Sequence, residues 1–169
     1  MWATRAGSAL PCTRFGHSLP SAPLSHQWPG ARGIGVDRSA EALGVARANA
    51  ERLGMGDRAT IAPGGWEGRG GPHDLILCNP PYIETGASLP REVAAFEPAG
   101  ALFAGADGLD DYRAIAPLLR RQIAPGGVAC VEIGSDQGEA AAALFRAEGL
   151  AVAVRPDLAG RDRCLVVTP

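Results

Sequence analysis

Four consecutive residues, Asn79-Pro80-Pro81-Tyr82, carry the clearest chemical signal in this chain of 169 residues. They follow the apolar run 73–78, which is typical of a buried strand. Two prolines cannot donate to a sheet ladder, so they suit a rigid lip where a strand ends. The Asn79 side chain and the Pro80 backbone then offer two fixed carbonyl acceptors, which fit the two hydrogens of a planar NH₂ group. Holding both hydrogens would aim the nitrogen lone pair at an electrophile. The alternative is an ordinary Pro-Pro turn.

Asp37 is a second candidate, because it ends the short apolar run Gly33-Ile34-Gly35-Val36 just before a capped helix. A carboxylate in that place accepts hydrogen bonds from a ribose diol in dinucleotide and S-adenosylmethionine folds. The other interpretation is a solvated aspartate at a strand end, and the residue alone does not decide between them.

Trp66, in the sequence Gly-Gly-Trp-Glu, is either an aromatic platform for a purine or a loop side chain folded onto the core. Glu97 and Asp107 lie in the long segment after the lip, where they either shape a substrate lid or simply form turns. His73 has no partner at catalytic spacing and is expected to be structural. The chain has no nucleophile elbow and no GxxxxGK[ST] phosphate loop.

Strands and helices are predicted to alternate from residue 32 onward. Strands are expected at 33–37, 59–62, 73–78, 128–133, 150–155 and 164–168, and helices at 39–53, 110–123 and 136–148. A capping box is expected from Asp136 and Glu139. The alternation indicates an α/β domain with a mostly parallel sheet, in which ligands bind at the carboxyl ends of the strands. Asp37, Asn79 and Glu132 should therefore line one rim.

Residues 1–31 differ from this pattern, because they hold four prolines and no sustained period, and we expect them to be irregular. The domain organisation predicted is therefore an irregular segment 1–31 and a domain 32–169. The net charge of −2, with no basic stripe, argues against direct nucleic-acid binding. No apolar run approaches a membrane span of about 20 residues. Four distant cysteines form no zinc pair, and Cys78 and Cys130 are expected to be buried thiols.

Taken together, these motifs resemble the HemK/PrmC family, methyltransferases that use S-adenosylmethionine to modify the glutamine N5 of class 1 peptide chain release factors. The similarity runs from about residue 29 to 168. It rests on GIGVD (33–37), Gly65-Trp66, NPPY (79–82), FEPAGALFAGADGLDDYR (96–113), PGG (125–127), EIGSDQGEA (132–140) and DLAGRDR (157–163). The motif NPPY also occurs in adenine-N6 DNA methyltransferases.

The resemblance implies a class I methyltransferase fold, which is Rossmann-like. It implies that Asp37 and Gly35 bind S-adenosylmethionine, with Trp66 and Asn79 also at the cofactor. It further implies that Asn79, Pro80, Pro81 and Tyr82 are catalytic and, with Glu97, bind the glutamine. No metal is implied. The implied partner is a class 1 release factor, and a cytoplasmic monomer is expected.

Three departures from the family pattern stand out. The family has an N-terminal helical domain for which this chain has no room. Its central first strand and D/E-L-G-x-G-x-G loop should precede Pro29, where this chain reads LPCTRFGHSLPSAPLSHQ instead. The family has an acidic residue before the tryptophan, where this chain has Gly65. We therefore expect a sheet lacking its first strand, and a segment up to about residue 27 that is out-of-frame or misassigned sequence.

Three functions are compatible with these observations. The first is glutamine-N5 methylation of release factors. The second is a non-catalytic truncated remnant of the same family. The third, an adenine-N6 nucleic-acid methyltransferase, is disfavoured by the acidic net charge and by the FEP and DLAGRDR segments. We expect this polypeptide, taken alone, to be inactive.

Overall fold

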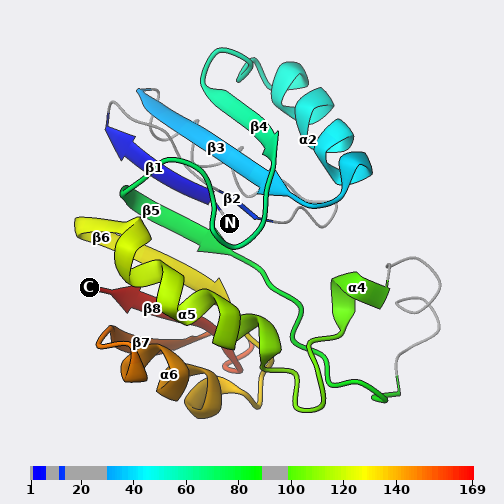
Figure 1. Ribbon diagram of the computed structural model, residues 1–169, viewed down its shortest axis with the longest axis vertical. Helices are drawn as coiled ribbons and strands as arrows, with labels where there is room; N and C mark the ends of the chain where they lie inside the picture. Colours follow the sequence, from blue (N-terminus) through cyan, green and yellow to red (C-terminus); the bar gives the residue numbers. More distant parts are fainter. Residues whose placement is uncertain (1, 7–11, 14–29, 89–98) are drawn as a thin grey trace.

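The computed structural model describes residues 2–6, 12–13, 30–88 and 99–169, which form one sheet with helices packed against it (Figure 1). The central parallel strands are β3 (Ala31–Asp37), β5 (His73–Cys78) and β6 (Ile123–Glu132). β4 (Ala59–Pro63) pairs in parallel with the outer edge of β3. On the other side, β8 (Asp162–Thr168) runs antiparallel to both β6 and β7 (Ala151–Pro156). The predicted α/β class is confirmed, but the sheet is mixed rather than mostly parallel.

Helix α2 (Ala40–Arg52) forms where the sequence predicts it, for the predicted reasons. The Ser39 hydroxyl accepts a hydrogen bond from the Ala42 amide at 3.2 Å and so caps the first turn. Leu43, Ala46 and Ala50 form its buried face. Gly54, at φ +65°, ends the helix in the left-handed conformation that glycine adopts without strain.

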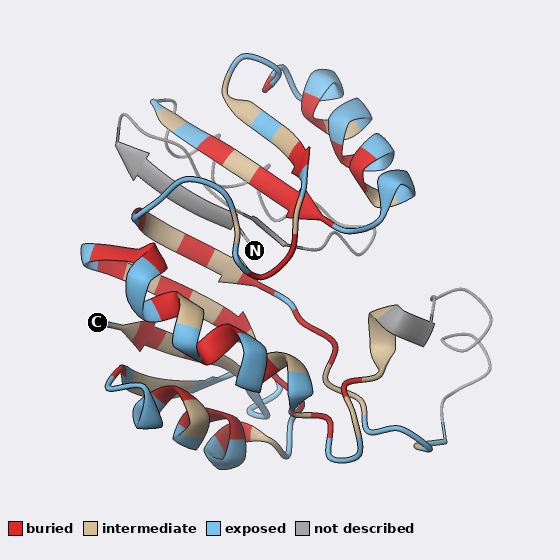
Figure 2. Cartoon of the chain, in the orientation of Figure 1, coloured by how far each residue is buried: buried red, intermediate tan, exposed pale blue. Residues whose placement is uncertain are grey.

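The second half of the fold is built on helices α5 (Asp110–Gln122) and α6 (Gly138–Ala147). Figure 2 shows their buried faces turned toward the sheet and their exposed faces toward solvent. The Tyr112 and Phe145 rings meet edge to face, with centroids 6.4 Å apart, and both side chains are fully buried. This pair joins the two helices over β6 and β8.

Three local predictions in this half are wrong. The residue before α6 is Gln137, and no side chain caps this helix, so the expected capping box of Asp136 and Glu139 does not form. β6 begins at Ile123, before the predicted start of this strand at residue 128. Cys78 is buried as expected, but Cys130 is half-exposed, because it points to the opposite face of β6 from buried Ala129 and Val131.

The N-terminal segment differs from the expectation that residues 1–31 are irregular and that the sheet lacks a strand. β1 (Trp2–Ala6) lies between β3 and β5 and runs antiparallel to both. β2 (Cys12–Thr13) continues the same position and is parallel to both neighbours. The expected gap is therefore filled, because the facing edges of β3 and β5 offer unpaired backbone groups that an added chain segment satisfies.

The segment after β5, for which the sequence predicts no helix or strand, contains short regular elements. Ile83 forms an isolated bridge with Phe103, just after the short helix α4 (Ala99–Leu102). Residues 89–98 lie outside the described residues. Within the described part of the chain, no helix is long and apolar enough to span a membrane.

Candidate active site

The carboxyl ends of β3, β5 and β6 meet at one rim, as the sequence predicts. Figure 1 shows the arrowheads of these three strands pointing to the same side. Thr13 of β2 pairs with both Val36 and Cys78, so the residues that follow them, Asp37 and Asn79, lie at the same level. Cys78 in turn pairs with Val131, which places Glu132 beside Asn79. The rim therefore brings together an acid, an amide and a second acid from three separate strands.

Asp37 has a buried oxygen available for a ligand. The side chain is only 7% exposed, and its Oδ1 accepts a hydrogen bond from the Ser39 amide at 2.7 Å. Its Oδ2 is buried and has no hydrogen-bond partner among the described residues. Because burying an acceptor without a partner costs free energy, this oxygen is suited to accept from a ligand hydroxyl. The atom fits the predicted ribose contact.

The lip itself is anchored by its prolines and leaves its acceptors open. Pro80 and Pro81 are buried, whereas Asn79 is exposed and Tyr82 is half-buried. Within the described residues, no group hydrogen-bonds to the Asn79 side chain or to the Pro80 carbonyl. The fixed φ of the buried prolines restricts the backbone of the lip at the rim. That the two acceptors hold an amide stays a prediction.

The Tyr82 ring closes one side of the rim. Its hydroxyl donates to Glu132 Oε1 at 3.3 Å, and Glu132 ends β6. Burial raises the pKa of the Tyr82 phenol above its ordinary value, and the nearby Glu132 carboxylate raises it further. The phenol therefore keeps its proton and acts as a donor, which suits packing and orientation rather than proton abstraction.

Trp66 is part of the hydrophobic core. The side chain is 9% exposed, and its indole nitrogen donates to Asp111 Oδ1 at 2.7 Å. The Gln122 carboxamide holds the same loop by donating to the Trp66 and Glu67 carbonyls at 3.0 and 2.9 Å. Of the two interpretations of Trp66, the geometry favours a loop tryptophan folded onto the core. A contact with adenine stays a prediction.

Gly35 and Glu97 are two further site residues that the sequence predicts. Gly35 lies inside β3, two residues before Asp37, and is paired with Trp2 on one side and Ile61 on the other. Its role at the cofactor stays a prediction. Glu97 falls in 89–98, outside the described residues. Among the residues that are described, no cluster of His, Cys, Asp or Glu has a metal-binding arrangement.

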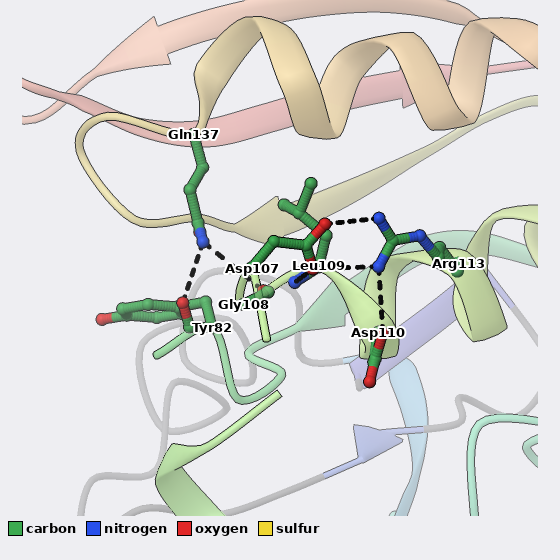
Figure 3. A network of polar contacts seen from close by, with 7 residues as sticks. All are labelled: Tyr82, Asp107, Gly108, Leu109, Asp110, Arg113 and Gln137. Carbon is green, nitrogen blue, oxygen red and sulfur yellow. Dashed lines mark hydrogen bonds and ion pairs between the residues drawn. The ribbon is translucent and has the colours of Figure 1, made fainter. Parts of the chain in front are cut away.

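Sequence reasoning missed Gln137, which contacts the lip from the start of α6. Figure 3 shows its carboxamide pointing at Tyr82 and Gly108. Its Nε2 donates to the Tyr82 carbonyl at 2.8 Å and to the Gly108 carbonyl at 3.4 Å. The residue lies in the EIGSDQGEA segment, but nothing in the pattern of apolar residues shows that its side chain reaches a segment 55 residues away.

Solved structures with the same fold are methyltransferases. The chain superposes on a methyltransferase from Pyrococcus furiosus with a TM-score of 0.66 and 15% identity, covering 93% of this chain and 72% of that one. It superposes on TrmN from Thermus thermophilus with a TM-score of 0.62 and 17% identity, covering 95% of this chain and 43% of that one. The fold is that of the class I S-adenosylmethionine-dependent methyltransferases.

Proteins similar in sequence point to one kind of methyltransferase within this class. The chain is 45% identical over 141 residues to a release factor glutamine methyltransferase from Rhodospirillum rubrum, covering 81% of this chain and 43% of the relative. It is 47% identical over 142 residues to one from Caulobacter vibrioides, covering 80% and 49%. No family model matches the chain. Over about four fifths of its length the chain is thus similar to release factor glutamine methyltransferases, the HemK/PrmC family, and it spans about half the length of these curated relatives.

Proposed function

We propose that this chain carries the part of a release factor glutamine methyltransferase that binds the methyl donor and the target amide. The reaction is transfer of a methyl group from S-adenosylmethionine to the side-chain nitrogen of a glutamine in a class 1 peptide chain release factor. The observation that supports this most is the lip, where two acceptors without partners lie level with Asp37. The proposed partner is thus a protein, and the proposed location is the cytoplasm.

Asp37 is the residue that would hold the methyl donor, through the buried Oδ2 that lacks a partner among the described residues. S-adenosylmethionine supplies an electrophilic methyl carbon when it is bound. Gly35 and Trp66 belong to the proposed cofactor set by resemblance alone, while the structure places them in a strand and in the core.

Asn79 and Pro80 are the residues that would act on the glutamine. An amide nitrogen is a poor nucleophile, because its lone pair is delocalised into the carbonyl. Two acceptors that hold both N–H bonds fix the plane of the amide, so orientation supplies the rate increase. Pro81, Tyr82 and Glu97 complete the proposed substrate set. The proton that leaves the nitrogen passes to water in this proposal, so no strong base is needed.

The second candidate, a remnant that no longer binds the cofactor, is favoured by one feature. β1 runs antiparallel to its neighbours at the place where the family has its first strand, and residues 12–29 lack the glycine-rich loop expected after that strand. In that case the rim would keep its shape without catalysing transfer. An adenine-N6 activity on nucleic acid is disfavoured by the net charge of −2.

Transfer of a radiolabelled methyl group to a purified class 1 release factor tests the proposal. The Caulobacter vibrioides relative serves as the positive control. Labelling of the release factor by the wild-type chain would support the proposal, and Asn79→Ala should then lower the rate by about 100-fold, the order found on removing one oriented hydrogen-bonding group. Asn49→Ala, which removes the other asparagine of the chain, should have no effect. No labelling by the wild type beside an active control would favour the remnant.

A further inference from the structure

We propose that Gln137 is a positioning residue that fixes the orientation of the lip 79–82. The effect of Gln137 on catalysis rests on the proposed function. That Gln137 fixes the lip follows from contacts within the chain alone. Gln137 directly precedes α6 and is half-buried, 55 residues from the lip in sequence. Its carboxamide makes hydrogen bonds to four different residues of the chain, so its role is not that of a solvent-exposed polar residue.

The four contacts match the chemistry of an amide. On the donor side, Nε2 reaches the carbonyls of Tyr82 and Gly108 at 2.8 and 3.4 Å. On the acceptor side, Oε1 receives the Gly134 amide at 3.1 Å and, at 3.5 Å, shares the Tyr112 hydroxyl hydrogen with the closer Glu132 carbonyl at 3.1 Å. Both acceptors face the nitrogen and both donors face the oxygen, so only one orientation of the amide satisfies all four.

The two carbonyls that Gln137 holds belong to the two arms of one loop. Ile83 donates to the Leu102 carbonyl at 2.9 Å and its own carbonyl accepts from Ala104 at 2.8 Å. Thr85 donates to the Gly105 carbonyl at 2.7 Å. Tyr82 precedes this pairing and Gly108 follows it, so Gln137 fastens the paired arms where they leave the body of the domain. Figure 3 shows the carboxamide between them.

The close fit around the carboxamide is built from glycines. A Cβ on Gly108 would lie 2.6 Å from Gln137 Nε2, and a Cβ on Gly134 would lie 2.8 Å from Gln137 Oε1. Any other residue would push the amide away from its partners. Because Pro80 and Pro81 have fixed φ, holding the Tyr82 carbonyl limits the directions that the Pro80 carbonyl can take. Gln137 thus acts through the lip rather than on the substrate.

Hydrogen exchange in the full chain, with no methyl donor present, tests this directly. Gln137→Glu keeps the size of the side chain but turns both donors into negatively charged acceptors facing carbonyls. We expect the amides of Ile83, Thr85 and Ala104 to exchange at least tenfold faster, with the strand amides of Val131 and Val167 changed less than twofold. Glu139→Gln, the reverse substitution on the exposed side of α6, should leave all five unchanged.

Gln137→Met is the second variant, because methionine has a similar length, no hydrogen-bonding amide and no charge that could unfold the protein. It should show the same pattern of exchange as Gln137→Glu. Wild-type exchange at the three loop amides in both variants would overturn the proposal. An equal acceleration at Val131 and Val167 would also overturn it, since that is the result of a merely structural role.

Kinetics separate this inference from the proposed function. If the wild-type chain methylates a release factor, Gln137→Met should lower kcat by at least tenfold with KM for S-adenosylmethionine unchanged. An unchanged kcat beside faster exchange would overturn the positioning role. If the wild type shows no methylation, the proposed function fails, and the exchange experiment still decides whether Gln137 fixes the lip.

Discussion

Replacing Gly108 by alanine should destabilise this protein much more than the same change at another glycine of similar conformation. Gly108 has φ +71° and Gly160 has φ +78°, so alanine is strained at both, by about 1–2 kcal/mol. Nothing lies within 4 Å of a Cβ on Gly160. A Cβ on Gly108 would collide with the Tyr82 carbonyl and lie 2.6 Å from Gln137 Nε2.

Relief of that collision requires breaking the two hydrogen bonds from Gln137 Nε2, each worth roughly 0.5–1.5 kcal/mol. Because Gly108 lies two residues before α5, whose Tyr112 and Ile115 are in the core, the shift also reaches the core. We therefore expect Gly160→Ala to cost about 1–2 kcal/mol and Gly108→Ala about 2–5 kcal/mol. Urea unfolding followed by circular dichroism measures both. Equal costs would refute the reasoning that close packing at Gly108 holds the lip.

Three further predictions concern the helices that support the rim. Tyr112→Phe should cost about 1 kcal/mol in urea unfolding, because its hydroxyl donates to the Glu132 carbonyl at 3.1 Å, and no cost would contradict that bond. Phe145→Ala should cost about 3–5 kcal/mol, and a cost below about 1 kcal/mol would show that the site is not packed as described. The Arg113 guanidinium lowers the pKa of Asp107 from 3.8 to about 2, so this carboxylate stabilises the fold above about pH 4 and loses the effect as pH falls toward 2. Asp107→Asn should therefore be destabilising at pH 6 but neutral at pH 2, and a penalty independent of pH would contradict the ion pair.

Most of the fold follows from local signals that the sequence carries openly. Strand β5 is a short apolar run ended by two prolines, and α2 has a serine cap, a buried face and a glycine stop. The rim could be predicted because the carboxyl ends of parallel strands meet at one edge, which places Asp37 and Asn79 at the same rim without knowledge of side-chain contacts.

The features that could not be predicted depend on partners distant in sequence. The segment Trp2–Ala6 has no strand-like apolar run, and it pairs because β3 and β5 leave backbone groups between them. Gln137 is a polar residue at a helix start, and three of its four partners lie 25 or more residues away in sequence. The sequence does not decide whether Trp66 contacts a ligand or packs in the core. The hydrogen bond from its indole to Asp111 favours the core.

Titration of S-adenosylmethionine into this 169-residue chain by calorimetry tests the central proposal most directly. We predict measurable binding by the wild type. Asp37→Asn, which replaces the buried acceptor without a partner, should weaken binding by roughly 10- to 100-fold, the worth of a hydrogen bond to a charged group. Glu41→Gln, the same change at an exposed site on α2, should bind like the wild type. No heat at millimolar ligand, or equal affinity for Asp37→Asn and the wild type, would contradict the proposal.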